Sequence, residues 1–383
     1  MAEQPVYLDN HATTRVDPRV LQEMLPYFCE EYGNPASISH SYGTRAAEAV
    51  EQARQQVADC VGASPREVIF TSGATEASNL ALRGVLQAAG AGAGLVTDAA
   101  EHRAVLDPAR KLKRQGFHLT VLPVDATGRL DPAQVATAIT SETTLVSVIL
   151  ASNEVGTLND LAAIGAICRE RGVLLHTDAV QAVGTVPIDF RSLPVDLLSL
   201  SAHKFYGPKG TGALIVRRDR GRIRLVSQID GGGHEQQLRS GTLAVPLIVG
   251  FGAACQLVQA EREADAARLG SLRDDLWRRL QQELDGLWLN GHPEYRLPGN
   301  LNVSFEGVDG DALLAGLKRI AVSSGSACTS HNPEPSHVLR AMGRSDTLTR
   351  ASLRFGIGRF NTPAEIELAA AEVVETVRRL RGK

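Results

Sequence analysis

The sequence predicts an α/β protein that has a large, mostly parallel sheet domain and a smaller α+β domain. Short apolar runs alternate with amphipathic helical patterns from residue 44 to residue 216, as in consecutive βαβ units. A strongly helical stretch at 247–289 follows, and beyond it strand-like and helix-like segments are interleaved. The 383 residues suffice for more than one domain. We place the large domain at 15–257 and the small domain at 1–14 and 258–383.

The elements of the large domain follow from hydrophobic periodicity. The first 45 residues are rich in Gly, Asn, Pro and Ser, so they are expected to be irregular apart from a short helix near 20–28; His11, Asn34 and His40 in this segment either line a site or are exposed loop residues. Residues 44–61 place apolar side chains three and four apart, which predicts an amphipathic helix. Strands separated by helices are then expected at 67–71, 95–97, 118–124, 143–150, 173–175 and 196–200. A strand at 213–219 and a second strand just before residue 230 should complete the domain.

The small domain begins after the stretch at 247–289, whose charged side chains indicate a solvated helix linking the two domains. Strands are expected at 301–305, 321–328 and 352–360, and helices at 311–317 and 365–380. This mixture predicts an α+β arrangement.

Composition and charge exclude several classes of function. The formal net charge is −3 and charges of both signs are interspersed, so we expect neither direct nucleic-acid binding nor membrane binding. The N-terminus lacks a signal-peptide pattern, and no stretch approaches the ~20 apolar residues of a membrane span. We therefore expect a soluble, cytoplasmic protein.

The five cysteines stand at 29, 60, 168, 255 and 328, without a CxxC pair, which argues against a disulfide framework and a zinc site. Cys60 and Cys168 lie in helix-like stretches and should be buried and inert. Cys328 lies among Ser, Gly, Ala and Thr, so we expect it to be accessible on a mobile loop, where a thiol can act as a nucleophile. The pair Cys328 and His331 is too small a ligand set for a metal, and none is expected.

Polar clusters follow two apolar runs, at the ends of the predicted strands 173–175 and 196–200. The first cluster ends in Asp178 and the second contains Ser201, His203 and Lys204. Open α/β sheets bind ligands at the carboxyl ends of their strands. An amine and a carboxylate at such an edge suit pyridoxal phosphate, with Lys204 in a Schiff base and Asp178 on the pyridine nitrogen. A structural ion pair is the alternative.

A phosphate site is predicted where the strand 67–71 turns into a helix through Ser72, Gly73, Ala74 and Thr75. This turn matches neither GxGxxG nor GxxxxGK[ST], so it favours another phosphorylated cofactor over a dinucleotide or ATP. His102, after another strand, could stack on a cofactor ring and exchange protons, or could be structural. The segment 239–242 could bind phosphate or form a hairpin.

Nine short segments together resemble those of one family. They are YLDNHATT, GNPAS, FTSGATE, EH at 101–102, NEVG, HTDAVQAVG, SAHKFYGPKGTGAL, GGGHEQQLRSGT and SSGSACTS, in order between about Tyr7 and about Phe360. The sequence is similar to the NifS/IscS-type cysteine desulfurases of group I, which belong to the class V aminotransferase family. The resemblance implies the fold-type I, aspartate aminotransferase-like architecture and pyridoxal 5′-phosphate as cofactor. His11 stands where many members carry a smaller or different residue.

The resemblance also implies a role for each matching residue. Lys204 would bind the cofactor covalently, Asp178 would hold the pyridine nitrogen, Gln181 would bond the phenolic oxygen and His102 would stack on the ring. The phosphate would be held by Ala74, Thr75, Ser201 and His203, and by Thr242 from the other subunit of a homodimer. Asn153 would contact the cofactor and, together with Arg354, orient the substrate, Arg354 through the substrate carboxylate. Cys328 would carry the persulfide.

The implied reaction removes sulfur from L-cysteine and gives L-alanine. Lys204 would remove the Cα proton, His102 would take the thiol proton and Cys328 would accept the sulfur, for delivery to an iron–sulfur scaffold, a thiolation enzyme or a DNA-modification protein. A selenocysteine lyase and a non-catalytic sulfur-transfer adaptor are the alternative functions.

Overall fold

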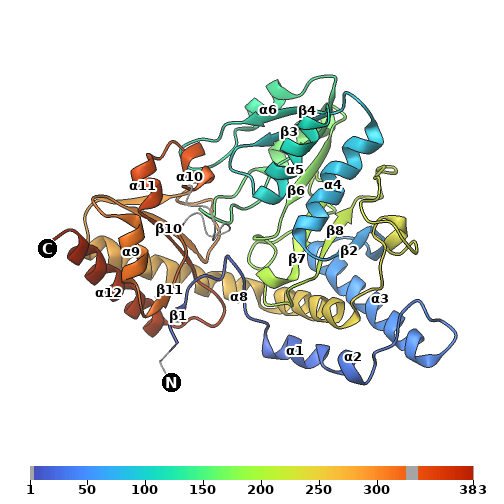
Figure 1. Ribbon diagram of the computed structural model, residues 1–383, viewed down its shortest axis with the longest axis horizontal. Coiled ribbons are helices and arrows are strands. Elements are labelled where there is room, and N and C mark those ends of the chain that lie inside the picture. The colour runs from blue at the N-terminus through green and yellow to red at the C-terminus, as the bar shows by residue number, and fades with distance from the viewer. Residues whose placement is uncertain (1–3, 325–334, 383) are drawn as a thin grey trace.

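The computed structural model describes residues 4–324 and 335–382, and Cys328 therefore lies outside the described residues. Its largest element is a seven-stranded sheet (Figure 1). The strands, in spatial order, are β2 (Val68–Thr71), β8 (Gly212–Val216), β7 (Leu197–Ser201), β6 (Leu174–Asp178), β5 (Thr143–Ser147), β3 (Gly94–Asp98) and β4 (His118–Leu122). The five strands from β7 to β4 run parallel, whereas β8 is antiparallel to both β7 and β2. The predicted mostly parallel sheet is confirmed.

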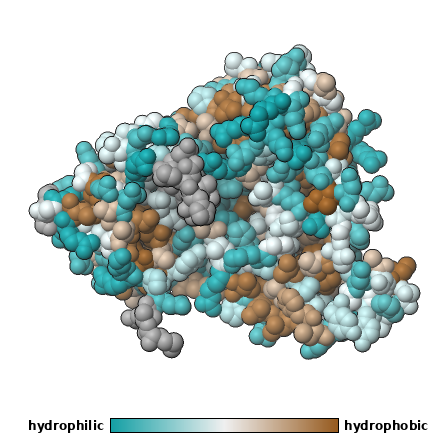
Figure 2. Space-filling view, viewed as in Figure 1, coloured by the Kyte–Doolittle hydropathy of each residue, from teal (hydrophilic) through white to brown (hydrophobic). Residues whose placement is uncertain are grey.

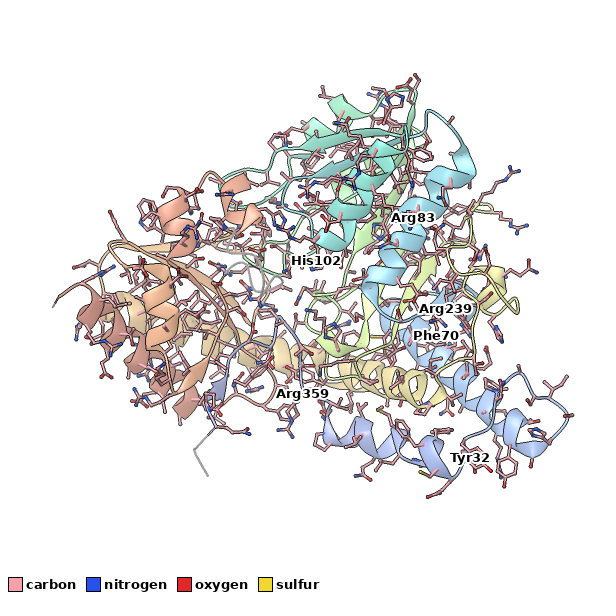
Figure 3. The ribbon with its side chains drawn as sticks, in the orientation of Figure 1. Tyr32, Phe70, Arg83, His102, Arg239 and Arg359 are labelled. Atoms are coloured by element: carbon pink, nitrogen blue, oxygen red, sulfur yellow. The ribbon has the colours of Figure 1, made fainter. Side chains whose placement is uncertain are left out.

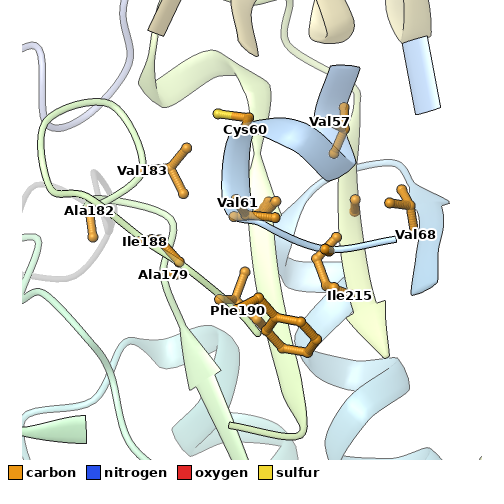
Figure 4. Close-up of a cluster of buried hydrophobic side chains, with 14 of the residues drawn as sticks. Val57, Cys60, Val61, Val68, Ala179, Ala182, Val183, Ile188, Phe190 and Ile215 are labelled. Carbon is orange, nitrogen blue, oxygen red and sulfur yellow. The ribbon is translucent and has the colours of Figure 1, made fainter. Parts of the chain in front are cut away.

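Helices cover both faces of this sheet because successive strand residues point to opposite sides. Ile69, Leu95 and Leu145 pack with α4 (Ala74–Ala89) and α5 (Arg103–Arg114). Their neighbours Phe70 and Val146 belong to the cluster on the other face. That cluster includes residues of α3 (Ser41–Val61), α6 (Pro132–Ala138), α7 (Leu161–Glu170) and the first part of α8 (Val245–Glu283). Figure 4 shows the part of it around Phe190.

The second part of the molecule is built on a three-stranded antiparallel sheet, β12 (Ser352–Gly356), β10 (Asn300–Phe305) and β9 (Leu287–Asn290). Beside it, β1 (Val6–Tyr7) pairs in parallel with β11 (Ile320–Ala321). The helices of this part are α9 (Gly310–Gly316), α10 (His337–Ala341), α11 (Asp346–Arg350) and α12 (Pro363–Leu380). The chain thus returns its N-terminal strand to the C-terminal part of the protein (Figure 1).

The 39-residue helix α8 joins the two parts. Its side chains up to Val258 pack in the large-sheet cluster, and those from Leu269 pack in a separate cluster with Leu8, β10, β12 and α12. The domain limits at 14 and 258 stay a prediction, which this change of cluster along α8 supports. None of the helices within the described ranges is long and apolar enough to cross a membrane.

The N-terminal region before α3 contains two short helices, α1 (Pro18–Met24) and α2 (Pro26–Cys29), where a single short helix was expected. Asn34 and His40 both make local turn and cap contacts here. Asn34 Oδ1 accepts from the Ala36 N–H, and His40 Nδ1 accepts from the Gly43 N–H at the start of α3. Of the three polar residues considered in this region, only His11 lies beside the site described below.

The strand expected just before residue 230 is wrong. Within that stretch the structure has irregular backbone, and the Val226 N–H donates to the Gly84 carbonyl of α4. The reason is topological, because β2 and β7 already pair with the two edges of β8 and leave no room for a hairpin partner. Of the strand expected at 321–328, β11 includes Ala321 and Ser323 forms an isolated bridge with Arg354, while residues from 325 lie outside the described part.

Candidate active site

A cavity of about 480 Å³ opens at the carboxyl ends of the parallel strands. It is lined by Asp178 at the end of β6, Ser201 at the end of β7, and residues that follow β2, β3 and β5. Nine of the ten residues predicted to hold the cofactor line this single cavity: Ala74, Thr75, His102, Asn153, Asp178, Gln181, Ser201, His203 and Lys204. Figure 3 shows His102 at the edge of the large sheet that faces the small sheet. The tenth, Thr242, is exposed in the segment before α8 and was predicted to act in a partner subunit.

The start of α4 forms one end of the cavity. Gly73 adopts a φ of 148°, which favours glycine, and no side chain among the described residues caps the helix. The first N–H groups of a helix lack partners within the helix, and the helix dipole adds partial positive charge there. Strand β8 runs directly behind this turn, because a Cβ at Gly212 would lie 2.7 Å from the Gly73 Cα. The N–H groups of Ala74 and Thr75 are therefore fixed in a position suited to an anion.

Asp178 provides a buried carboxyl group elsewhere in the same cavity. Burial raises its pKa, while His102 and Lys204 act in the opposite direction. Oδ1 accepts one hydrogen bond from the Val180 N–H at 3.0 Å. A buried carboxylate gains most from a directly opposed cation, so a protonated ring nitrogen is a suitable partner.

Lys204 follows Ser201 in a short 3₁₀ turn, Ala202–Lys204, after β7. Its Nζ donates to the carbonyl oxygens of His11 at 2.6 Å and Ala12 at 2.8 Å. Two residues later, Tyr206 adopts a left-handed φ of 69°. Contacts from elsewhere in the chain hold it there, since its N–H donates to Thr14 Oγ1 at 2.8 Å and its hydroxyl accepts from the Arg359 N–H at 2.5 Å. The loop that carries the lysine is thereby fixed on both sides.

His102 is the N-cap residue of α5, and its Nδ1 accepts a hydrogen bond from the Ala104 N–H at 3.1 Å. The neutral ring therefore carries its proton on Nε2. Burial lowers the pKa of His102, which favours the neutral form. Behind it, the pKa of Glu101 is raised well above its usual value by burial and by the neighbouring carboxyls of Asp98 and Asp178.

Arg354 on β12 lies beside the cavity rather than among its lining residues, and it is 1% exposed. Its Nη1 donates to the Asn153 carbonyl at 2.9 Å, and its Nη2 donates to Asp9 Oδ1 at 2.8 Å and Ser323 Oγ at 3.0 Å. Its buried Nε has no hydrogen-bond partner among the described residues. An N–H in that state is available to a bound carboxylate.

Comparison with known proteins gives consistent results. Residues 6–368 match the family model described as "Aminotransferase class-V". The chain is 56% identical to the "Cysteine desulfurase IscS" of Anaeromyxobacter dehalogenans (strain 2CP-C), over 98% of this chain and 93% of the relative. It is 52% identical to the protein of the same name from Ectopseudomonas mendocina (strain ymp), over 98% of this chain and 94% of that relative.

The chain belongs to the class V aminotransferases. Within that family its relatives are cysteine desulfurases, as the resemblance predicted. A solved structure titled "NIFS-LIKE PROTEIN" superposes with a TM-score of 0.91 at 36% identity, covering 98% of this chain and all of that one. Another, "SspA in complex with cysteine", has a TM-score of 0.83 at 35% identity and covers 93% of this chain and all of that one. The predicted fold-type I architecture is confirmed.

Class V aminotransferases of this kind use pyridoxal 5′-phosphate, and the cavity suits that molecule. It offers an uncapped helix start for the phosphate, a buried carboxyl group for the pyridine nitrogen and a lysine for the aldehyde. Ser201 and His203 lie with the helix start on the lining of the cavity, and Gln181 and Asn153 complete the polar lining.

Sequence reasoning gave no role to Glu76, which lines the cavity, or to three further polar residues of the site. Thr13 and Lys209 line the cavity, and Asp9 pairs with Arg354. All three lie within the motifs YLDNHATT and SAHKFYGPKGTGAL, which were quoted for the resemblance without a role for these positions. Thr13 Oγ1 lies 3.1 Å from His203 Nδ1, which connects the N-terminal segment to a predicted phosphate ligand.

Proposed function

We propose that this protein removes sulfur from L-cysteine, releases L-alanine and holds the sulfur as a persulfide on Cys328. The proposal depends on one observation above all: a single cavity brings together Lys204, the buried Asp178 and the start of α4, with Arg354 beside it. The lysine suits the aldehyde of pyridoxal phosphate, the carboxylate suits its ring nitrogen, and the anion site at the helix start suits its phosphate.

Bound pyridoxal phosphate would withdraw electrons from the Cα atom of the substrate amino acid. The residues of this chain would orient the cofactor and the substrate and would transfer protons. Asp178 keeps the ring nitrogen protonated, because its buried carboxylate is stabilised by a facing cation. The ring of His102, with its proton on Nε2 and its Nδ1 engaged by Ala104, is held in one orientation for stacking.

Proton transfers then fall to Lys204 and His102. The neutral Lys204 amine takes the Cα proton. His102 takes the substrate thiol proton on Nδ1, where it gives up the hydrogen bond from the Ala104 N–H for this step, and becomes neutral again by releasing the proton to solvent. The Cys328 thiolate attacks the substrate sulfur, so that an S–S bond forms while the C–S bond breaks and its electron pair stays with the departing carbon fragment. Protonation of that fragment yields alanine.

The substrate carboxylate is assigned to Arg354, with Asn153 as its neighbour. The support is that Arg354 is fixed by Asp9, Ser323 and the Asn153 carbonyl, while Nε is buried without a partner among the described residues. A guanidinium held in this way can accept a carboxylate without reorganisation.

We further propose a homodimer, in which Thr242 reaches the phosphate of the partner subunit. Exposed apolar side chains of α1, α2, the following loop and the first turn of α3 support an interface there: Leu21, Leu25, Phe28, Tyr32, Ile38 and Tyr42. Figure 2 shows apolar surface along the region of α1 and α2. Exposed apolar surface of this kind often marks a protein–protein interface. The sulfur is passed on to an acceptor protein, and the cytoplasm stays the predicted location.

The experiment is to map the sulfur. Holoenzyme is incubated with L-cysteine, alkylated without reductant and digested, and the peptides are analysed by mass spectrometry while alanine is quantified. We expect the persulfide on the peptide that contains Cys328, and none in Cys328→Ser. Cys29→Ser is the matched control, because Cys29 is an exposed free cysteine away from the cavity. A persulfide that persists in Cys328→Ser, or alanine release without any protein persulfide, would overturn the proposal.

A further inference from the structure

His11 and Gln181 form a closed pair at the edge of the cavity. The Gln181 Nε2 donates to the His11 carbonyl oxygen at 2.9 Å, and the Gln181 Oε1 lies 3.0 Å from the His11 Nδ1. Both ends of the amide are therefore engaged by one residue, which lies 170 positions earlier in the chain. Gln181 itself lines the cavity.

The chemistry of these atoms fixes the orientation of the amide. A carbonyl oxygen only accepts hydrogen bonds, so the His11 carbonyl requires the amide nitrogen to face it. Turning the amide by 180° would set two oxygens against each other. The amide oxygen then faces Nδ1 of the ring, and because it too is only an acceptor, Nδ1 must carry a proton.

The electrostatic surroundings leave the ring with that one proton. Burial, followed by the charge of Arg354, lowers the pKa of His11 to about 4, and Lys204 acts in the same direction. The ring is therefore neutral at pH 7, and its hydrogen bond to Gln181 selects the tautomer with the proton on Nδ1.

One donor of Gln181 remains for a ligand. The amide nitrogen has two hydrogens, and one of them is given to the His11 carbonyl. The other has no acceptor among the described residues, although Gln181 lines the cavity. It suits the phenolic oxygen of pyridoxal phosphate, an acceptor that carries negative charge when the adjoining Schiff-base nitrogen is protonated.

We propose that His11 is a positioning residue that holds the Gln181 amide with an N–H turned toward the phenolic oxygen of the cofactor. This inference rests on the proposed contact between Gln181 and that oxygen. The imidazole donates its Nδ1 proton to the amide oxygen, so the nitrogen end of the amide stays turned toward the cavity, and the donor is oriented before the cofactor binds.

The proposal has a spectroscopic consequence. A donor to the phenolic oxygen stabilises its negative charge and so weakens its hold on the neighbouring Schiff-base proton. Without an ordered donor, the Schiff-base proton is held more tightly. The midpoint of the change in visible absorbance that follows loss of this proton then moves to higher pH. A residue that only stabilised the fold would leave this midpoint in place.

The test compares His11→Phe with His11→Asn, each reconstituted with pyridoxal phosphate and titrated with pH while the visible spectrum is recorded. Asn places an N–H on the atom that corresponds to Nδ1, one bond beyond Cγ, and keeps the donor, whereas Phe does not. We expect the midpoint to rise in His11→Phe and to stay near the wild-type value in His11→Asn. The cofactor dissociation constant should rise about threefold to tenfold in His11→Phe, the loss expected for one hydrogen bond.

A double mutant shows whether the effect passes through Gln181. Gln181→Met removes the amide at similar size, and it should raise the midpoint on its own. His11→Phe should then add no further shift in the Gln181→Met background. An equal shift in both backgrounds, or the same shift in His11→Asn as in His11→Phe, would overturn the inference. His118→Phe, on exposed β4, controls for the loss of an imidazole.

Failure of the proposed function would look different. If the wild-type protein showed no pH-dependent Schiff-base absorbance at all, the assignment of Lys204 would fail. If the wild type showed that absorbance and His11→Phe left it unchanged, the inference on His11 alone would be wrong.

Discussion

Replacing Arg354 by lysine should weaken binding of the substrate carboxylate. Both hydrogens of Nη2 and one of Nη1 are used by Asp9, Ser323 and the Asn153 carbonyl, which leaves Nε and one Nη1 hydrogen for a ligand. A lysine ammonium has three hydrogens and would donate them to the same three protein acceptors, which leaves none for the ligand. Loss of a charge-assisted hydrogen bond costs about 1.5–3 kcal/mol, which corresponds to about 10- to 150-fold in affinity.

The assay is a spectral titration of holoenzyme that carries Cys328→Ser, so that sulfur transfer does not proceed. Dissociation constants are measured for L-cysteine and for cysteamine, which has the same amine and thiol but no carboxylate. Arg354→Lys should weaken the binding of L-cysteine by about 10- to 150-fold and leave the binding of cysteamine nearly unchanged. Arg114→Lys, on the exposed end of α5, is the control. An equal loss for both ligands would refute the assignment, because it would mean a general distortion of the cavity.

Three further changes test other parts of the structure. Glu235→Leu breaks a buried ion pair with Arg54 (2.8 Å) and should cost about 3–5 kcal/mol of unfolding free energy, whereas Arg54→Met combined with Glu235→Leu should cost less than the sum of the single changes. Gly212→Ala places a Cβ 2.4 Å from a backbone oxygen and 2.7 Å from the Gly73 Cα, so it should displace the start of α4 and weaken cofactor binding in an absorbance titration. Burial raises the pKa of Glu154 to about 7, so this group stabilises the fold below the ordinary glutamate pKa of 4.5 and that stabilisation is lost as the pH rises to about 7. Glu154→Gln should reduce this fall in stability, measured by urea denaturation across that pH range.

Each of these has a contradicting result. If the losses of unfolding free energy in Arg54→Met and Glu235→Leu simply add in the double mutant, the two side chains are not coupled. Tight cofactor binding by Gly212→Ala would mean that the turn before α4 adapts without cost. Gly270→Ala in α8, where an added Cβ would lie 3.9 Å from the Pro298 Cβ, controls for the gain of a methyl group. An unchanged pH profile in Glu154→Gln would show that Glu154 is ionised in the fold at neutral pH.

The residues that follow the parallel strands could be predicted from the sequence. Asp178 and Lys204 come directly after apolar runs, and the carboxyl ends of parallel strands share one edge of the sheet. Local sequence order thus determines which polar side chains meet. The turn before α4 was predictable for the same reason, since a strand, a glycine and a helix start are consecutive in the chain.

The N-terminal contribution to the site could not be predicted in this way. Thr13 lines the cavity, and His11 and Asp9 lie beside it, because β1 pairs with β11, more than 300 residues away, and so fixes the start of this segment. A polar loop has no periodicity that would indicate its neighbours. Only the contacts to Gln181, His203 and Arg354 give these residues a role.

The misplaced strand before residue 230 has a different cause. Its alternating Arg, Ile, Arg, Leu and Val residues have the period of a strand, but pairing requires a free sheet edge. Because β2, from early in the chain, occupies the edge of β8, local propensity is overridden by topology.

Reductive trapping shows directly whether Lys204 holds pyridoxal phosphate in this cavity. Purified holoenzyme is treated with borohydride, which makes a Schiff base permanent, then digested and analysed by mass spectrometry. We expect a reduced pyridoxyl phosphate group on the peptide containing Lys204 and its loss in Lys204→Ala. The same group on another lysine, such as Lys209 on the cavity lining, or none on any peptide, would contradict it.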